Sequence, residues 1–174
     1  MILRLYEYSC IKPSDINEHM HTLFDISIKC SHITEMGVRN MVSTWAFLAG
    51  LVSQGRGTYV GIDIADSSTY GVSPDVVGKM ASNRGVNYKF HVADTLKIEI
   101  EPTEFLFLDT EHTKKQVSEE LELHASKVSK FIGFHDTLIP EVKEAVEDFL
   151  NKNKEWKMYL ENYFNSGLII IKRI

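Results

Sequence analysis

Residues 32–44 of the chain, HITEMGVRNMVST, join a short apolar strand to a helix through a turn that contains one glycine. Gly37 ends the strand, and Ser43 is among the first residues of the helix. Dinucleotide-binding folds usually have two more glycines in this turn, because the backbone there closely approaches two phosphates. Arg39 and Met41 stand in the turn instead. The stretch therefore predicts the first ligand-binding turn of an α/β fold, for a ligand without a pyrophosphate.

Periodic apolar patterns along the rest of the chain predict alternating strands and helices. The expected strands are 32–36, 58–64, 87–92, 104–109, 130–135, 156–164 and 167–173, and the expected helices are 14–29, 42–54, 73–85, 113–128 and 140–153. This order predicts an α/β fold with a doubly wound, mostly parallel seven-stranded sheet that ends in an antiparallel hairpin. The stretch between the third and fourth strands is too short for a regular helix, so one crossover is expected to be abbreviated. We expect a single domain, 1–174, with an N-terminal helical segment, 1–30, and a core, 31–174.

The composition is typical of a globular domain, with 44% hydrophobic and 25% charged residues among 174. A formal net charge of −5 without a basic cluster argues against nucleic acid as a partner. No apolar segment approaches the roughly 18–20 residues that span a bilayer, so no membrane partner is expected. Cys10 and Cys30 are too few for a disulfide framework, and the N-terminus lacks a signal-peptide pattern. These features predict a reduced, cytoplasmic protein.

An acidic residue lies at or close to the end of each predicted parallel strand. Ligands of doubly wound sheets bind outside the carboxyl ends of the strands, so these side chains are expected to share one rim. Asp63, at the end of the second strand, suits the ribose hydroxyls of an adenosine-containing cofactor. One acid alone could simply mark where a strand leaves the core, whereas five together favour a ligand site. The five acids are Glu35, Asp63, Asp94, Asp109 and Asp136.

EMGVRNMVST, GID, VAD, FLDTEH and IGFHDTL follow one another in this order along the chain. This ordered set resembles the class I S-adenosylmethionine-dependent methyltransferases. Within them it is most similar to the small metal-dependent O-methyltransferases, such as the caffeoyl-CoA and catechol O-methyltransferases and the cephalosporin-hydroxylase-like group. The resemblance extends from about Ile33 to the last residue and includes the terminal hairpin. It implies the Rossmann-like methyltransferase fold and S-adenosylmethionine as cofactor, although the second glycine of the usual turn is missing.

The resemblance also implies roles for individual residues at the cofactor. Glu35 and Gly37 would face its methionine part, and Ser43 would face its carboxylate. Asp63 would hold the ribose. The remaining residues expected at the cofactor are Ala93 and Asp94 beside the adenine, and Asp109.

Asp109, His135 and Asp136 match positions that carry metal ligands in these relatives. The resemblance therefore implies a divalent ion, Mg²⁺ or Mn²⁺, that lowers the pKa of a substrate hydroxyl. An imidazole in the set also suits other divalent ions. If His135 points away, the site is metal-free and His135 acts as general base. His112 is a second candidate base, because it stands where the relatives have a lysine, but a helix N-terminal histidine that bonds the loop is an equally good interpretation.

The leading hypothesis is therefore a methyltransferase that moves a methyl group from S-adenosylmethionine to a hydroxyl oxygen of a small molecule or sugar, with help from a divalent metal. An NAD-dependent enzyme of Rossmann type is the first alternative, disfavoured by the single glycine and the terminal hairpin. A non-catalytic nucleotide-binding relative is the second alternative. The chain is too compact for a substrate-covering domain, so the acceptor site is expected to be open or completed by another copy in a homo-oligomer.

Overall fold

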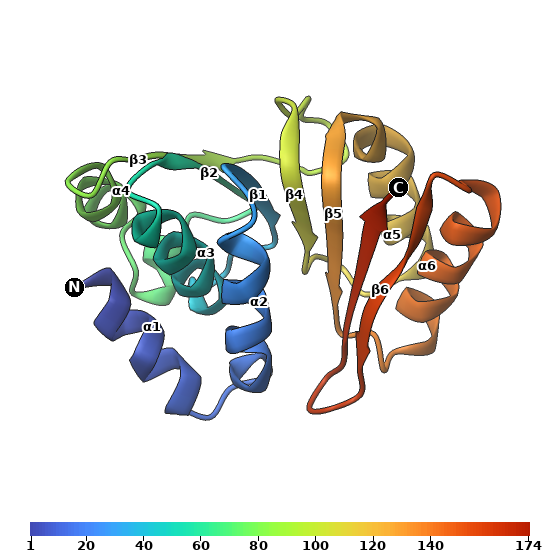
Figure 1. Cartoon of the computed structure of the whole chain (residues 1–174), viewed down its shortest axis with the longest axis horizontal. Coiled ribbons are helices and arrows are strands. Elements are labelled where there is room, and N and C mark those ends of the chain that lie inside the picture. Colours follow the sequence, from blue (N-terminus) through green and yellow to red (C-terminus); the bar gives the residue numbers. More distant parts are fainter.

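The computed structural model describes residues 1–174 and contains one seven-stranded sheet in the order β3-β2-β1-β4-β5-β7-β6 (Figure 1). The five strands β1 to β5 run parallel, and β7 pairs antiparallel with both β5 and β6. This confirms the predicted doubly wound sheet with an antiparallel hairpin at its end. The strands are β1 His32–Met36, β2 Gly57–Asp63, β3 Val86–Val92, β4 Thr103–Leu108, β5 Val128–His135, β6 Trp156–Asn162 and β7 Leu168–Arg173.

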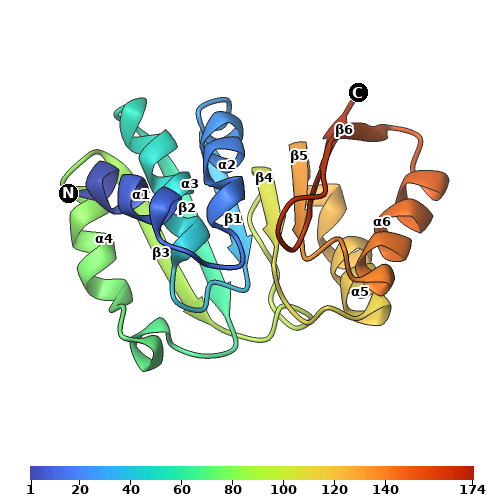
Figure 2. The same ribbon diagram turned by 90° about the horizontal axis from the view of Figure 1, so that it is seen from below.

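Helices cover the sheet from both sides. Figures 1 and 2 show α1 to α4 gathered on one side of the molecule and α5 with α6 on the other. The helices are α1 Ile2–Ile11, α2 Met20–Ser27, α3 Val42–Ser53, α4 Pro74–Ser82, α5 Lys114–His124 and α6 Pro140–Lys152, with short 3-10 turns η1 Asn17–His19, η2 Ser67–Tyr70 and η3 Ala125–Lys127. No helix has both the length and the apolar character that crossing a membrane requires.

The central strands are buried on both faces, which explains their nearly continuous apolar sequences. In β4, Phe105 and Phe107 belong to the core under α1 to α4, whereas Leu106 and Leu108 belong to the core under α5 and α6. This alternation follows from the two-residue period of a strand.

The N-terminal segment differs from the prediction of one helix over 14–29. The structure has a helix at Ile2–Ile11, then a break, and a second helix only from Met20 onward. Pro13 explains the break, because the residue before a proline is disfavoured in helical conformation, and Lys12 is extended. The Ser14 amide donates to the Asn17 side chain at 3.1 Å, so Ser14 belongs to a local turn and not to a helix cap.

The crossover between β3 and β4 contains no helix, as the sequence predicted. Residues 93–102 cross the face of the sheet that also carries α5 and α6, where Ile100 joins the same core, and Ala93 continues the ladder by donating to the Asp63 carbonyl at 2.8 Å. The ends of β2 and β3 are thereby held together, and the loop that follows β3 begins beside Asp63.

Candidate active site

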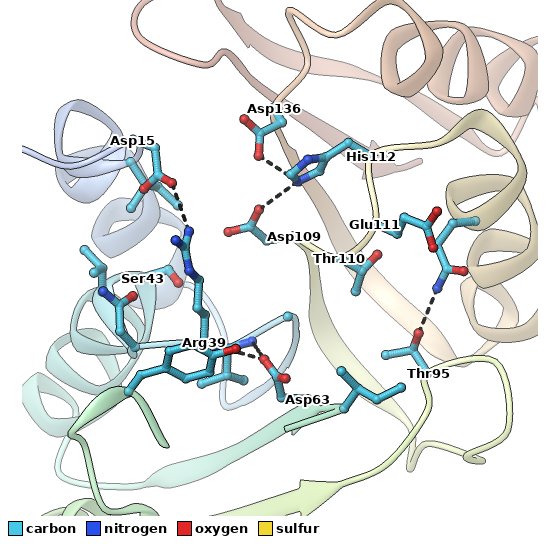
Figure 3. A pocket seen from close by; sticks show the side chains of 18 of the residues that line it. Asp15, Arg39, Ser43, Asp63, Thr95, Asp109, Thr110, Glu111, His112 and Asp136 are labelled. Carbon is cyan, nitrogen blue, oxygen red and sulfur yellow. Dashed lines mark hydrogen bonds and ion pairs between the residues drawn. The ribbon is translucent and has the colours of Figure 1, made fainter. Parts of the chain in front are cut away.

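A cavity of about 470 Å³ lies at the carboxyl ends of the parallel strands, where the sequence predicted a ligand site. Its walls come from the segments that follow β1 to β5 and from the segment between α1 and η1 (Figure 3). Most of the residues predicted at the site line this cavity, and Glu35 and His135 do not. The predicted residues in its lining are Gly37, Ser43, Asp63, Ala93, Asp94, Asp109, His112 and Asp136.

The turn after β1 has the backbone shape of a glycine-rich turn although it contains one glycine. Gly37 has φ 83°, Arg39 has φ 48° and Met41 has φ 63°, all in the left-handed region. Residues other than glycine adopt this region at a cost of about 1–2 kcal/mol each. The fold therefore keeps the ligand-binding shape of the turn and accepts backbone strain at Arg39 and Met41.

Asp63 holds this turn in place. Its Oδ2 accepts hydrogen bonds from the amides of Val38 and Arg39 at 2.8 and 2.7 Å, and its Oδ1 accepts from the Ala65 amide at 2.9 Å. The residue is 9% exposed and its carboxylate lies in the cavity wall (Figure 3). Asp63 therefore organises the backbone of the site and also lines the cavity.

The end of the cavity beside β3 combines apolar surface with one carboxylate. Ile64, Tyr70 and Leu96 line this end together with Ala93. Asp94 is fixed by the Leu96 amide, which donates to Oδ1 at 3.0 Å, and by Lys97, which pairs with Oδ2 at 2.8 Å. The Lys97 ammonium and this amide lower the pKa of Asp94. Such a surface suits a flat heteroaromatic ring with a polar edge.

Glu35 does not reach the cavity, contrary to the expectation that it faces the cofactor. Its side chain is fully buried beneath α3 and accepts hydrogen bonds from the hydroxyls of Ser43, Thr44 and Tyr59. Burial raises the pKa of Glu35 to about 7, although these three hydroxyls act in the opposite direction. Ser43 lines the cavity, but its hydroxyl hydrogen is directed at Glu35. Glu35 therefore anchors the first turn of α3 from below.

The opposite end of the cavity holds Asp109, His112 and Asp136 (Figure 3). His112 Nε2 lies 2.8 Å from Asp136 Oδ2 and 3.7 Å from Asp109 Oδ1. Hydrogen bonds to the two carboxylates raise the pKa of His112 to about 9. The imidazole is 40% exposed, more than the side chains of Asp109 and Asp136, which are 22% and 15% exposed.

His135 lies behind these residues and is enclosed by protein. Its Nδ1 is 3.0 Å from both Asp109 Oδ1 and Asp136 Oδ2, and its Nε2 is 3.0 Å from the Asp15 carbonyl oxygen. Burial lowers the pKa of His135, but the hydrogen bonds and charges of the two carboxylates outweigh burial and raise the pKa to about 10. Nε2 therefore faces a main-chain carbonyl and Nδ1 faces the two carboxylates.

The metal site implied by the resemblance was expected at Asp109, His135 and Asp136. The structure brings these three side chains together, with His135 Nδ1 3.0 Å from an oxygen of each acid. One atom each from Asp109, His112 and Asp136 lies within 4.8 Å of the others, a spacing that could also hold an ion.

The segment between α1 and η1 contributes to the site in a way that the sequence patterns did not indicate. Asp15 lines the cavity, and its carboxylate pairs with Arg39 at 3.5 Å across the cavity (Figure 3). Its carbonyl accepts from His135, and Asn165 in the β6–β7 turn donates to the neighbouring Ser14 carbonyl at 2.8 Å. His19 is fully buried with its ring 6.0 Å from that of His135. All of these contacts except the Asp15–Arg39 pair join residues more than 100 positions apart, so no local sequence pattern predicts them.

Comparisons with known proteins identify the fold. No protein-family model and no curated protein matches the sequence. A Staphylococcus aureus protein described as a candidate caffeoyl-CoA O-methyltransferase superposes with a TM-score of 0.72 at 12% identity, covering 99% of this chain and 92% of that chain. An O-methyltransferase from Bacillus cereus in complex with SAH gives 0.66 at 16% identity, with 99% and 89% covered.

TomG, an O-methyltransferase from Streptomyces achromogenes in complex with SAM, gives a TM-score of 0.67 at 12% identity, with 94% of this chain and 82% of that chain covered. The chain therefore has the fold of class I O-methyltransferases, as the ordered motifs predicted. The coverage extends over nearly the whole chain, including the N-terminal helices in the two longer alignments.

Proposed function

We propose that the protein is a methyltransferase that transfers the methyl group of S-adenosylmethionine to a hydroxyl oxygen of a small molecule or sugar. The observation that carries this proposal is one continuous cavity with two chemically different ends. The Gly37 turn, Asp63 and Asp94 form a nucleoside-type end, and Asp109, His112 and Asp136 form an acid–base end. The likeness of the whole fold to SAH-bound and SAM-bound O-methyltransferases supports it.

The nucleoside-type end fits the parts of S-adenosylmethionine. Asp63 would accept hydrogen bonds from the ribose hydroxyls, and the apolar surface around Leu96 would contact the adenine, with Asp94 at its polar edge. The first turn of α3, at Val42 and Ser43, lines the cavity, and the unpaired amides of a helix N-terminus attract a carboxylate. When bound, the cofactor supplies an electrophilic methyl group.

The acid–base end would activate the acceptor. In neutral His112, Nε2–H is held by Asp136, so the ring takes the proton of the acceptor hydroxyl on Nδ1, and Asp136 stabilises the imidazolium that results. Asp109 keeps a carboxylate oxygen 3.7 Å from Nε2 and so helps to orient the ring. His135, the other candidate base, is enclosed by protein and is assigned no proton transfer. We therefore assign the role of base to His112, one of the two histidines that the sequence left open.

Calorimetry with S-adenosylhomocysteine and with NAD tests the cofactor. We expect binding of the first and none of the second; the reverse would identify an NAD-dependent enzyme and contradict the proposal. Asp63→Ala should weaken S-adenosylhomocysteine binding by about 1.5–3 kcal/mol, the value of hydrogen bonds to a charged group. Asp66→Ala, three residues further and outside the cavity wall, is the matched control and should bind as the wild type does.

Asp63 also holds the Gly37 turn, so the loss of affinity must be traced to the ribose itself. An S-adenosylhomocysteine analogue without the 2′-hydroxyl serves this purpose. We expect it to bind more weakly than the parent to the wild type, and equally with the parent to Asp63→Ala. Equal losses in both proteins would remove Asp63 from the ribose. A transfer assay with radiolabelled methyl donor and a panel of sugar and diol acceptors then separates an enzyme from a non-catalytic relative that only binds the cofactor.

A further inference from the structure

The part of the cavity beside the Gly37 turn lacks the two side chains that the resemblance implied for the methionine portion of the cofactor. Glu35 is fully buried outside the cavity wall, so it cannot receive an ammonium group there. Ser43 lines the cavity, but its hydroxyl donates to Glu35. The methionine portion of S-adenosylmethionine carries one ammonium and one carboxylate. Other residues therefore have to hold these two charges.

Asp15 and Arg39 present the two opposite charges that such a group requires. Arg39 is the only arginine or lysine in the cavity lining, and Asp15 reaches the cavity from the segment between α1 and η1. Arg39 Nη1 lies 3.5 Å from Asp15 Oδ2 (Figure 3). The side chains of Asp15 and Arg39 are 54% and 69% exposed, so a ligand can reach both. An ion pair this exposed contributes little to stability, so the two side chains can separate at little cost.

The other carboxylates of the cavity lining have protein partners or lie away from Arg39. Glu111 stands on the opposite side of the cavity from Arg39, near Thr95 (Figure 3). The Asp15 carboxylate has no protein partner besides Arg39. It is therefore the carboxylate of this cavity that is available to a ligand beside the Gly37 turn. The carboxylates that contact backbone amides, a lysine or histidines are Asp63, Asp94, Asp109 and Asp136.

The backbone holds Asp15 and Arg39 in place while their side chains stay accessible. The Asp15 carbonyl lies 3.0 Å from His135 Nε2, and the Arg39 amide donates to Asp63 Oδ2 at 2.7 Å. Arg39 keeps a left-handed backbone, with φ 48°, although its side chain is mostly exposed. Strain of this kind persists where the surrounding structure imposes it and is concentrated at ligand sites.

We propose that Asp15 and Arg39 form an amino-acid clamp, in which Asp15 receives the ammonium group of the methionine portion and Arg39 pairs with its carboxylate. The inference rests on the proposed function, because it takes S-adenosylmethionine as the cofactor. In this clamp the Asp15–Arg39 ion pair is replaced by two ion pairs with the ligand. The N-terminal segment thereby contributes directly to cofactor binding.

Calorimetry with two ligands tests the clamp without any activity measurement. S-adenosylhomocysteine carries the ammonium and the carboxylate, whereas 5′-methylthioadenosine keeps the adenosine and the sulfur but lacks both charges. We expect Asp15→Asn and Arg39→Gln each to weaken the binding of S-adenosylhomocysteine at least about tenfold, because each removes a charge-assisted contact. Both variants should bind 5′-methylthioadenosine as the wild type does.

Asp25→Asn and Arg56→Gln make the same substitutions at exposed residues outside the cavity wall and should change neither affinity. A wild type that binds the two ligands equally tightly would overturn the clamp. Clamp variants with unchanged affinity for S-adenosylhomocysteine, or with equal losses for both ligands, would overturn it as well. A wild type that binds neither ligand would contradict the proposed function itself, and the clamp with it.

Discussion

Gly37 and the main-chain carbonyl of Asp109 approach so closely that a Cβ atom on residue 37 would lie 1.8 Å from the carbonyl oxygen. The two residues follow β1 and β4, adjacent strands at the middle of the sheet. The Asp109 amide also donates to the Met36 carbonyl at 2.8 Å. The turn at the nucleoside-type end of the cavity is therefore packed directly against the backbone that carries the first carboxylate of the acid–base end.

Gly37→Ala should consequently damage both ends of the site. We expect a loss of about 2–4 kcal/mol in the free energy of unfolding, the sum of left-handed strain and a forced backbone shift. Gly55→Ala is a matched control, because Gly55 also has positive φ, 68°, but a Cβ atom added to it would meet nothing within 4 Å. That variant should lose only about 1 kcal/mol. Urea unfolding of the two variants measures the difference; equal losses would show that the close approach has no cost.

Met41 sets backbone strain against side-chain burial. Its φ of 63° favours glycine, and its side chain is fully buried in the core beneath α1 to α4. Relief of the strain in Met41→Gly is worth about 1–2 kcal/mol, whereas removal of a buried methionine costs about 2–5 kcal/mol. The lost burial should outweigh the relieved strain, and we expect Met41→Gly to be destabilised by about 1–3 kcal/mol.

Arg39→Gly is the comparison for Met41→Gly, since Arg39 has φ 48° and a side chain that is 69% exposed. In Arg39→Gly, strain relief is opposed only by backbone entropy and the loss of a surface ion pair. The free energy of unfolding of this variant should therefore stay within about 1 kcal/mol of the wild-type value. If Met41→Gly is more stable than the wild type, the strain of the positive φ costs more free energy than the burial of the Met41 side chain contributes.

The sheet and its order could be predicted because each element has a local signature. Strands of five to eight residues, β1 to β5, alternate with helices except between β3 and β4, and this order admits few topologies. The N-terminal segment resisted prediction, because α1 has no capping side chain at its start and only the nearby Pro13 marks its end. The apolar spacing after Ser14 was real, but a 3-10 turn occupies its first part.

The sequence predicted that an acid lies at each strand end, but it predicted only in part which way each side chain points. Glu35 is two residues from Ile33 on β1, and alternate residues of a strand share a face. Ile33 belongs to the core beneath α1 to α4, so the period of two already placed Glu35 under a helix. His135 differs, because its partners Asp15 and Asp109 are distant in sequence. Only the folded chain shows which groups His135 contacts.

Stability should depend on pH through His135. Its pKa is raised to about 10 in the folded protein, against about 6.5 in an unfolded chain. A raised pKa stabilises the folded state fully below pH 6.5, and this contribution is lost as the pH rises toward 10. We expect the wild type to lose on the order of 2 kcal/mol over this range, and His135→Gln to lose clearly less. Urea unfolding at intervals from pH 6 to 10 checks this. If the free energy of unfolding falls equally with pH in the wild type and in His135→Gln, the pKa of His135 is not raised.

The rate of methyl transfer should rise with pH if His112 is the base. Its pKa is raised to about 9, so at neutral pH the ring is mostly protonated and cannot accept a proton. With an acceptor that turns over, kcat/KM should increase about tenfold per pH unit below pH 9 and then level off. His112→Gln should lower kcat/KM by about 10²–10⁴ and abolish this slope.

His91→Gln is the control for His112→Gln, because His91 is exposed on β3 and lies outside the cavity wall. It should retain both the rate and the slope of the wild type. A wild-type profile that is flat from pH 7 to 9, or a slope that survives in His112→Gln, would mean that another group accepts the proton. Asp136 would not account for such a slope, since hydrogen bonds and charges from His112 and His135 hold its pKa well below its ordinary value despite burial. The pH profile therefore tests His112 separately from the carboxylates that orient it.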